Sequence, residues 1–254
     1  MRKLTIAACV ALVAASPTEP LVLAQRFAQI RAIGDVIEVR ADNVENALNH
    51  AIHELRQVCR CVISYEGPEW TYSADVRHEP DGRGGTIANA QRRTLHASVP
   101  GTLPLTRETA TGIVTELVAQ DERDGSSARY QVIQGRTLEV RAVRVKNRAG
   151  VDVDAELLLD TPISIARDTL DVATWISRIG FQLQRRTAKQ VLAGVSAGAP
   201  FSRQPVTLEA NDEPARTVLE RLLSSLQHPA GWNSMYIPAI RTYSLTVVFQ
   251  RVQG

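Results

Sequence analysis

Few residues of this 254-residue chain have the types and spacing that catalysis requires. The stretch Gly194-Val195-Ser196-Ala197-Gly198 matches the Gly-x-Ser-x-Gly pattern of a hydrolase. In a nucleophile elbow of that kind, a strand leads into the first glycine and a helix follows the serine. Pro200 would end a helix after Ser196, so we expect a turn of small residues here. A nucleophilic Ser196 stays open as an alternative.

Two cysteines, Cys59 and Cys61, follow the first 24 residues. On one extended strand their Cα atoms would be too far apart for good disulfide geometry. We therefore expect two buried thiols, with a strained bridge or an intermolecular disulfide as alternatives. A Cys59 nucleophile would need a histidine beside it. His50 and His53 lie off the apolar stripe of the preceding predicted helix, so we expect both in solvent.

Metal ligation and phosphate binding receive no support from residue spacing. His50, His53 and Glu54 share one predicted helix, but no second His or Cys cluster has the spacing of metal ligands. The glycine-rich segment 81–85 has no Lys-Ser or Lys-Thr pair and no helix directly after it, as a phosphate-binding loop requires. We predict no metal, no cofactor and no catalytic residue.

Charged and aromatic side chains near two predicted hairpins are candidates for contact with a partner. Apolar and charged residues alternate over 138–142, which places the arginines of this region on the solvated face of the strand. A basic sheet face can bind an acidic partner, although a solvated face without a partner is the commoner case. Aromatic residues in the last two predicted strands can anchor an interface or pack in the core. The candidate partner-binding residues are Arg136, Arg141, Arg144, Trp232 and Tyr236.

Composition and the amino-terminal segment indicate an exported protein. A formal net charge of +2 is too small to indicate binding to nucleic acid or to an anionic membrane. Arg2 and Lys3 precede an apolar run over residues 4–15, which is shorter than the ~20 residues that cross a bilayer. This is the layout of a secretory signal peptide, which we assign to residues 1–24, with cleavage near Ala15 as the alternative. We expect no membrane span and a periplasmic or secreted location.

The clearest fold signal is the stretch 204–226, QPVTLEANDEPARTVLERLLSSL. Residues 206–210 alternate as a half-buried strand does. Asn211 occupies the position of a helix N-cap and Pro214 that of the first turn, and leucines at spacings of three and four then form one apolar face. Residues 232–237 and 244–249 follow as two predicted strands.

A related order of elements is predicted in each half of the chain. The first half has a strand over 36–40, a helix over 44–58, a strand over 59–65, a long loop over 66–93, a strand over 94–99, a helix from Thr106, and strands over 130–133 and 138–145. The second half has a strand over 156–159, a helix from Thr161-Pro162 to a Gly180 cap, a strand over 181–184, a loop over 185–204, and the stretch described above. We predict an α+β fold of two tandem domains of related strand-helix-strand-strand-helix-strand-strand topology, residues 34–146 and 155–252, with a linker at 147–154.

The second half contains Val206-Thr207-Leu208, Ala215 and Leu222-Leu223, and the first half contains Ala47-Leu48. In these residues the chain shows a resemblance to the short N-terminal domain of secretins and TonB-dependent receptors. It covers most of residues 36–145 and 155–250, while the long loop and the doubled unit depart from the family. The resemblance implies a periplasmic interaction module and transfers no catalytic residue.

From these features we expect an exported, non-enzymatic protein of the cell envelope that docks protein partners through exposed strand edges. Outer-membrane or secretion components are the expected class of partner, and self-association is a further outcome. A secreted hydrolase that uses Ser196 or Cys59 and a glycan-binding protein are the alternatives.

Overall fold

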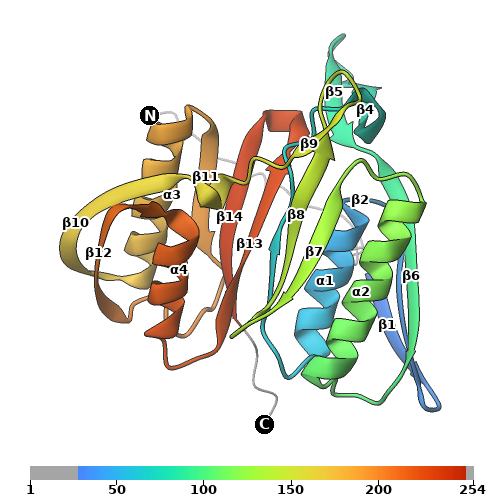
Figure 1. The fold of residues 1–254 in the computed structure, drawn as a ribbon, viewed down its shortest axis with the longest axis horizontal. Coiled ribbons are helices and arrows are strands. Elements are labelled where there is room, and N and C mark those ends of the chain that lie inside the picture. Colours follow the sequence, from blue (N-terminus) through green and yellow to red (C-terminus); the bar gives the residue numbers. More distant parts are fainter. Residues whose placement is uncertain (1–27, 250–254) are drawn as a thin grey trace, which may run out of the picture.

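The computed structural model describes residues 28–249, which form an α+β fold (Figure 1). The predicted signal peptide, residues 1–24, lies outside the described residues. The first half contains β1 (Ala28–Ile33), β2 (Val36–Glu45), α1 (Ala47–Val58), β3 (Ile63–Glu66), β4 (Val76–Pro80), β5 (Thr86–Ala90), β6 (Arg92–Pro100), α2 (Arg107–Arg123), β7 (Arg129–Gln134), β8 (Leu138–Lys146) and β9 (Asp152–Asp154). The second half contains β10 (Pro162–Asp171), α3 (Val172–Thr187), β11 (Gln190–Val195), β12 (Pro205–Pro214), α4 (Ala215–Ser224), β13 (Ala230–Ile237) and β14 (Thr242–Phe249).

One central sheet receives strands from both halves, in the order β11-β14-β13-β3-β8-β7, with β9 added beside β8. Within the first half β3 is parallel to β8, and β7 is antiparallel to β8. Within the second half β11 is parallel to β14, and β13 is antiparallel to β14. The halves therefore repeat the same strand order and the same directions. They are joined by parallel pairing of β13 with β3.

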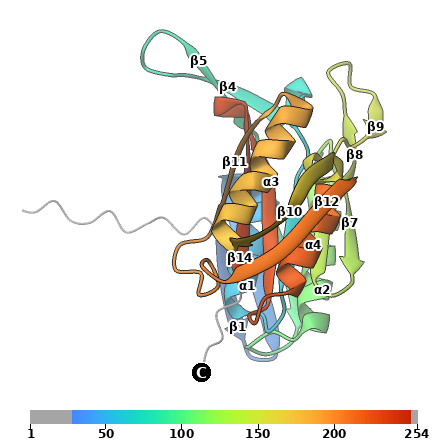
Figure 2. The same ribbon diagram turned by 90° about the vertical axis from the view of Figure 1, so that its left-hand side faces the viewer.

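Each half adds a pair of helices and an outer sheet to its part of the central sheet (Figures 1 and 2). Helices α1 and α2 lie between the central sheet and the sheet β1-β2-β6, and α3 and α4 lie between the central sheet and the pair β10-β12. The two helix pairs cover opposite faces of the central sheet. The strand pair β13-β3 shows this. Tyr65 of β3 packs in the core of the first half, and its pairing partner Asn233 lies on the same face of the sheet. The neighbouring Trp232 lies on the opposite face and packs in the core of the second half.

The helices bury the stripes that their sequences predict. Ala47, Ala51, Ile52 and Leu55 of α1 are almost fully buried, as are the leucines of α4. Each large aliphatic side chain removed from water stabilises the fold by about 1.5–3 kcal/mol. The predicted helix from Thr106 is confirmed as α2, whose N-cap Thr106 accepts a hydrogen bond from the Thr109 N–H. The strands predicted after each second helix are confirmed as β7, β8, β13 and β14.

The expectations for residues 156–204 are largely wrong. Pro162 begins strand β10, and the helix starts ten residues later, at Val172, where the Asp171 carboxylate accepts a hydrogen bond from the Thr174 N–H. This helix, α3, continues through Gly180, the expected cap, and through the expected strand at 181–184. Gly180 lies against β11, where a Cβ atom would collide with the Ala193 Cβ. Close packing, and not helix termination, is the reason for this glycine.

Three segments that were expected as loops or a linker are more ordered than expected. The predicted loop 66–93 contains a short 3-10 helix (Ser73–Asp75) and the hairpin β4-β5, which pairs Val76 with Ala90. The predicted linker 147–154 contains β9, and the predicted loop 185–204 contains β11. The short strands β4, β5, β9 and β11 gain their stability from a neighbouring strand that local sequence does not reveal.

The start of α4 also differs from the expectation. Asn211, the expected N-cap, belongs to β12, and Pro214 is the N-cap residue.

Candidate functional site

Among residues 28–249, the central sheet ends at β7 on one side and at β11 on the other, and each of these strands pairs with one neighbour. In β8 the Leu138 N–H donates to the Val62 carbonyl on the β3 side. Leu138 pairs with Gln134 of β7, and because the Leu138 N–H points toward β3, this pair is a non-hydrogen-bonded one. The N–H and C=O groups of Gln134, and by alternation those of Val132, therefore point away from the sheet. The first outward group of β7, the Tyr130 N–H, donates to the Glu122 carboxylate at 3.3 Å.

Strand β11 presents its backbone in the same manner. The Ser196 N–H, one residue past the strand, donates to the Val247 carbonyl on β14 at 2.9 Å. By alternation Val195 and Ala193 point their backbone groups away from β14. The outward Val191 N–H donates to the Gln184 side chain at 3.4 Å. At each end of the central sheet the first outward amide, that of Tyr130 or Val191, is bonded to a side chain of its own half. The residues that follow it offer a short row of outward backbone donors and acceptors.

The side chains of these two edges do not discourage pairing. Natural edges are protected by charges, prolines and bulges. Neither β7 nor β11 contains a proline, and the one charged residue in the two strands is Arg129 at the start of β7, beside a single register shift. Leu192 of β11 is 59% exposed. The outer pair β10-β12 differs, since both strands begin with proline, both carry charged residues, and their pairing shifts register twice. By this comparison, β7 and β11 are better suited to strand addition than β10 and β12.

The junction of β13 with β3 shows how this sheet accepts another strand. Asn233 pairs with Tyr65 and Ser234 with Glu66, and the Gly67 N–H donates to the Ser234 carbonyl at 2.9 Å. Arg56 of α1 spans the two strands. Its guanidinium donates to the Ile63 carbonyl on β3 (2.7 Å) and to the Trp232 carbonyl on β13 (3.2 Å).

A buried ion cluster lies on the other face of the same junction. Arg216 of α4 pairs with Glu66 on β3, with Glu139 on β8 and, at 3.1 Å, with Asp160. Glu66 is fully buried and also accepts a hydrogen bond from the Leu159 N–H at 2.9 Å. Burial raises the pKa of Glu66 to about 7, against the opposing effect of Arg216, and burial also raises the pKa of Glu139. These contacts join α4 to the sheet of the first half.

Sequence reasoning missed Arg56, Arg216 and Glu66 as junction residues. It also placed Glu139 on a solvated sheet face, which is wrong, because α4 of the second half covers this part of the face. The sequence did contain a weak indication of their role. Arg56 directly follows Leu55 of the apolar face of α1, and Arg216 directly follows Ala215 of the apolar face of α4. A charge at the margin of a buried stripe needs a partner, which here comes from the other half of the chain.

The five residues proposed for partner binding do not form one site. Arg136 and Trp232 line the same cleft of about 410 Å³ beside α4, and Arg136 donates to the Leu223 carbonyl at 3.3 Å. Arg141 is half-buried on β8, and Arg144 near the far end of β8 donates to the Asp152 carbonyl at 3.2 Å. Tyr236 packs on Tyr243, with ring centroids 5.1 Å apart.

Trp232 is a core residue with 2% exposure, and its indole N–H is buried without a hydrogen-bond partner among the described residues. Trp175 is fully buried, and its indole N–H donates to the Val206 carbonyl at 2.8 Å. Trp70 is half-buried against the first core. A glycan binder needs open aromatic faces, so this placement does not favour that alternative.

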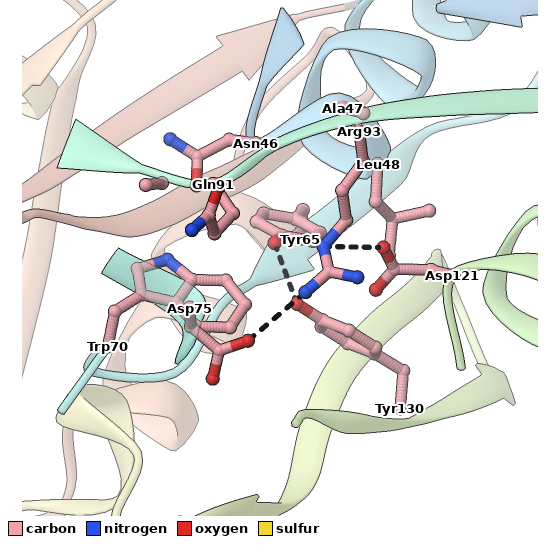
Figure 3. A pocket seen from close by; sticks show the side chains of 11 residues that line it. Asn46, Ala47, Leu48, Tyr65, Trp70, Asp75, Gln91, Arg93, Asp121 and Tyr130 are labelled. Carbon is pink, nitrogen blue, oxygen red and sulfur yellow. Dashed lines mark hydrogen bonds and ion pairs between the residues drawn. The ribbon is translucent and has the colours of Figure 1, made fainter. Parts of the chain in front are cut away.

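A polar pocket lies between the β4-β5 hairpin and the core of the first half, and residues of α1, β3 and β7 line it (Figure 3). Arg93 connects two buried carboxylates, with Asp75 at 3.1 Å and Asp121 at 3.8 Å. The hydroxyl groups of Tyr65 and Tyr130 lie 3.3 Å apart, and burial raises the pKa of both. The open volume of about 20 Å³ holds about one water molecule, so the pocket serves to fix the hairpin to the domain rather than to enclose an organic substrate.

The two alternative nucleophiles are placed as follows. Cys59 and Cys61 form a disulfide, so the expectation of two thiols is wrong; the chain bends after α1 and brings their Cα atoms to 5.2 Å. Ser196 follows β11 and precedes a turn, as expected. It lines a groove of about 770 Å³ together with His53, but its buried hydroxyl has no hydrogen-bond partner among residues 28–249. A serine nucleophile needs such a bond to its base, so the geometry does not favour the hydrolase.

Within the described part of the chain, no group of three or more His, Cys, Asp or Glu side chains is arranged to hold a metal ion. None of its helices combines the length and the apolar character needed to cross a bilayer. Comparison with known proteins finds no matching family model, no matching curated protein and no matching solved structure.

Proposed function

We propose that this chain is an exported, non-enzymatic protein of the cell envelope that docks protein partners by strand addition at the outer edges of β7 and β11. The observation that carries the proposal is the pair of unprotected edges at the ends of one sheet. In β-augmentation, the backbone supplies most of the binding energy, and side chains at alternate positions supply selectivity.

The chemistry of the chain supports the exported location. Structural disulfides persist in oxidising compartments such as the periplasm, and Cys59 and Cys61 form one. The signal-peptide pattern of residues 1–24 and the resemblance to an envelope interaction module point to the same compartment. The partners that we expect are envelope proteins with an extended segment, such as outer-membrane or secretion components.

The edges also set the expected affinity. About five residues can pair at each edge, and a backbone hydrogen bond contributes a net ~0.5–1.5 kcal/mol. Five such bonds contribute at most ~7.5 kcal/mol before the entropy of ordering the partner is subtracted, which is less than the ~8 kcal/mol of a micromolar complex. We expect reversible docking of a segment and not a permanent complex.

The test is crosslinking capture from the envelope of the native host, with the chain tagged at Gly254. Val132→Pro and Val195→Pro each remove one outward N–H from β7 or β11, and edge strands tolerate proline at such positions. Val132→Thr and Val195→Thr are the matched controls, because they change the side chain and keep the N–H. We expect a partner that the wild type and the threonine variants capture and that at least one proline variant loses. Capture that is equal in all five proteins would refute docking at these edges.

A further inference from the structure

We propose that one occupant of these edges is a second copy of the chain, with β7 of one copy paired in parallel with β11 of the next. This inference rests on the proposed function insofar as it uses the same edges, and it names a partner for them. The junction of β13 with β3 is its template, because that junction already joins the corresponding strands of the two halves.

The correspondence follows from the registers of the central sheet. In the second half Leu245 of β14 is flanked by Ser234 on one side and Ala193 on the other. In the first half Val140 of β8 is flanked by Val132 and Tyr65. Val132 thus occupies the position of Ser234, and Ala193 occupies that of Tyr65.

The register of the intermolecular pairing is then fixed. Asn233 pairs with Tyr65 in the junction, so Gln131 of one copy pairs with Ala193 of the next. The junction bond from the Gly67 N–H to the Ser234 carbonyl becomes a bond from the Val195 N–H to the Val132 carbonyl. Both of these groups point outward from their edges, as the alternation of β7 and β11 requires.

Strand direction permits the assembly without any reversal of the second copy. Both β7 and β11 run opposite to β3, β8 and β13, so they run the same way as each other. A second copy in the same orientation, displaced along the sheet and rotated by its twist, brings β11 parallel to β7. Such a heterologous contact uses two different surfaces, and it generates chains or rings and not a closed two-fold dimer.

The side chains at the outer edges fit a reversible contact. Gly194 occupies the position of Glu66, because Glu66 pairs with Arg141 one residue past Val140, and Gly194 pairs with Thr246 one residue past Leu245. No carboxylate needs burial there, and no counterpart of the Arg216 cluster is required. Gln184 occupies the position of Arg56, since each contacts the backbone of the residue seven positions later, Val191 or Ile63. The outer contact thus keeps the backbone pairing of the junction without its buried charges.

The first experiment measures sedimentation of the chain over a range of concentrations, alone and in a mixture of two variants. Wild type is expected to form concentration-dependent head-to-tail oligomers. Val132→Pro blocks β7 and Val195→Pro blocks β11, so each variant alone is expected to associate at least tenfold more weakly and to sediment as a monomer. In a 1:1 mixture the intact β11 of the first variant meets the intact β7 of the second, and we expect heterodimers that grow no further.

Other outcomes overturn the proposal. A wild type that stays monomeric at all concentrations refutes it. A symmetric dimer through β7 alone would leave Val195→Pro dimeric, and one through β11 alone would leave Val132→Pro dimeric. If a proline variant does not fold, Gln131→Lys and Leu192→Lys replace the pair, because they keep every N–H and place a charge at each edge.

A crosslink tests the register. Two residues after the pair of Gln131 with Ala193, the same register places Ile133 of one copy beside Val195 of the next. Ile133→Cys and Val195→Cys, in separate chains, are expected to form a mixed disulfide dimer, and Gln131→Cys with Val195→Cys, which is two residues out of register, is expected to form far less. Equal yields refute the register. Loss of self-association with retained, edge-dependent capture of an envelope protein would overturn this inference alone and leave the proposed function standing.

Discussion

Glu66 is a fully buried carboxylate at the place where the two halves meet, and its ionisation affects how firmly they are joined. Arg216 compensates its charge, but Arg216 also serves Glu139 and Asp160. Removing one partner from a buried ion cluster destabilises a protein strongly, because the remaining charge stays in a poorly solvated position. These contacts join α4 of the second half to β3 and β8 of the first half.

The raised pKa of Glu66 makes stability depend on pH. Its value of about 7 in the folded chain lies above the ordinary value of 4.5, so folding takes up a proton between these limits. The contribution of Glu66 to the free energy of unfolding is therefore fully present below pH 4.5 and is lost as pH rises through 7. We expect the advantage of wild type over Glu66→Gln in urea unfolding to fall by about 1–3 kcal/mol between pH 4.5 and pH 8.

The matched control is Glu116→Gln, which changes an exposed glutamate on α2. We expect its difference from wild type to stay nearly constant over the same range. A difference for Glu66→Gln that does not change with pH would show that Glu66 is ionised in both the folded and the unfolded chain.

At the scale of elements, the contact between α3 and β11 explains a glycine that sequence pattern misassigns. A side chain at Gly180 would collide with Ala193 of β11, although alanine is the better helix former. We expect Gly180→Ala to lower the free energy of unfolding by about 1–3 kcal/mol, because overpacking outweighs helix propensity. Thermal or urea unfolding measures this, and Ala193→Gly in the same chain should recover part of the loss.

Gly112 of α2 is the control for this prediction. A Cβ at Gly112 has no heavy atom within 4 Å, so Gly112→Ala is expected to stabilise the chain by up to about 1 kcal/mol. If both alanine substitutions stabilise, α3 does not pack on β11 as described.

The same pair of elements shows how far sequence reasoning reaches. Helix α4 and strands β13 and β14 were predictable, because apolar residues recur with the helical period of 3.6 and then with the strand period of 2 over contiguous residues. Helix α3 was displaced, since Thr161-Pro162 resembles a helix start and the true N-cap, Asp171, has the same local chemistry. Strand β11, and with it one candidate docking edge, was missed because its pairing partner β14 lies more than 40 residues away. The α+β class needed only local pattern, whereas the edges depend on which strands lie at the ends of the sheet.

At the scale of the whole molecule, one sheet runs through both halves and ends in two unlike edges. The second half presents β11, the first half presents β7, and the internal junction shows that strands of these two kinds pair in parallel. Helices cover alternate faces of successive halves, so a further copy would continue the same alternation. The architecture is that of two halves with the same strand order, joined edge to edge by the pairing of β13 with β3.

The most direct measurement is amide hydrogen exchange of the chain at low and at high concentration. The central claim is that copies of the chain associate with β7 of one copy paired to β11 of the next. It predicts that exchange at the Val132 and Val195 amides slows about tenfold or more when the chain associates, while the edge amides of β1 and β10 do not change. Slowing at β1 or β10 with no change at β7 and β11, or slowing at only one of β7 and β11, would contradict the claim.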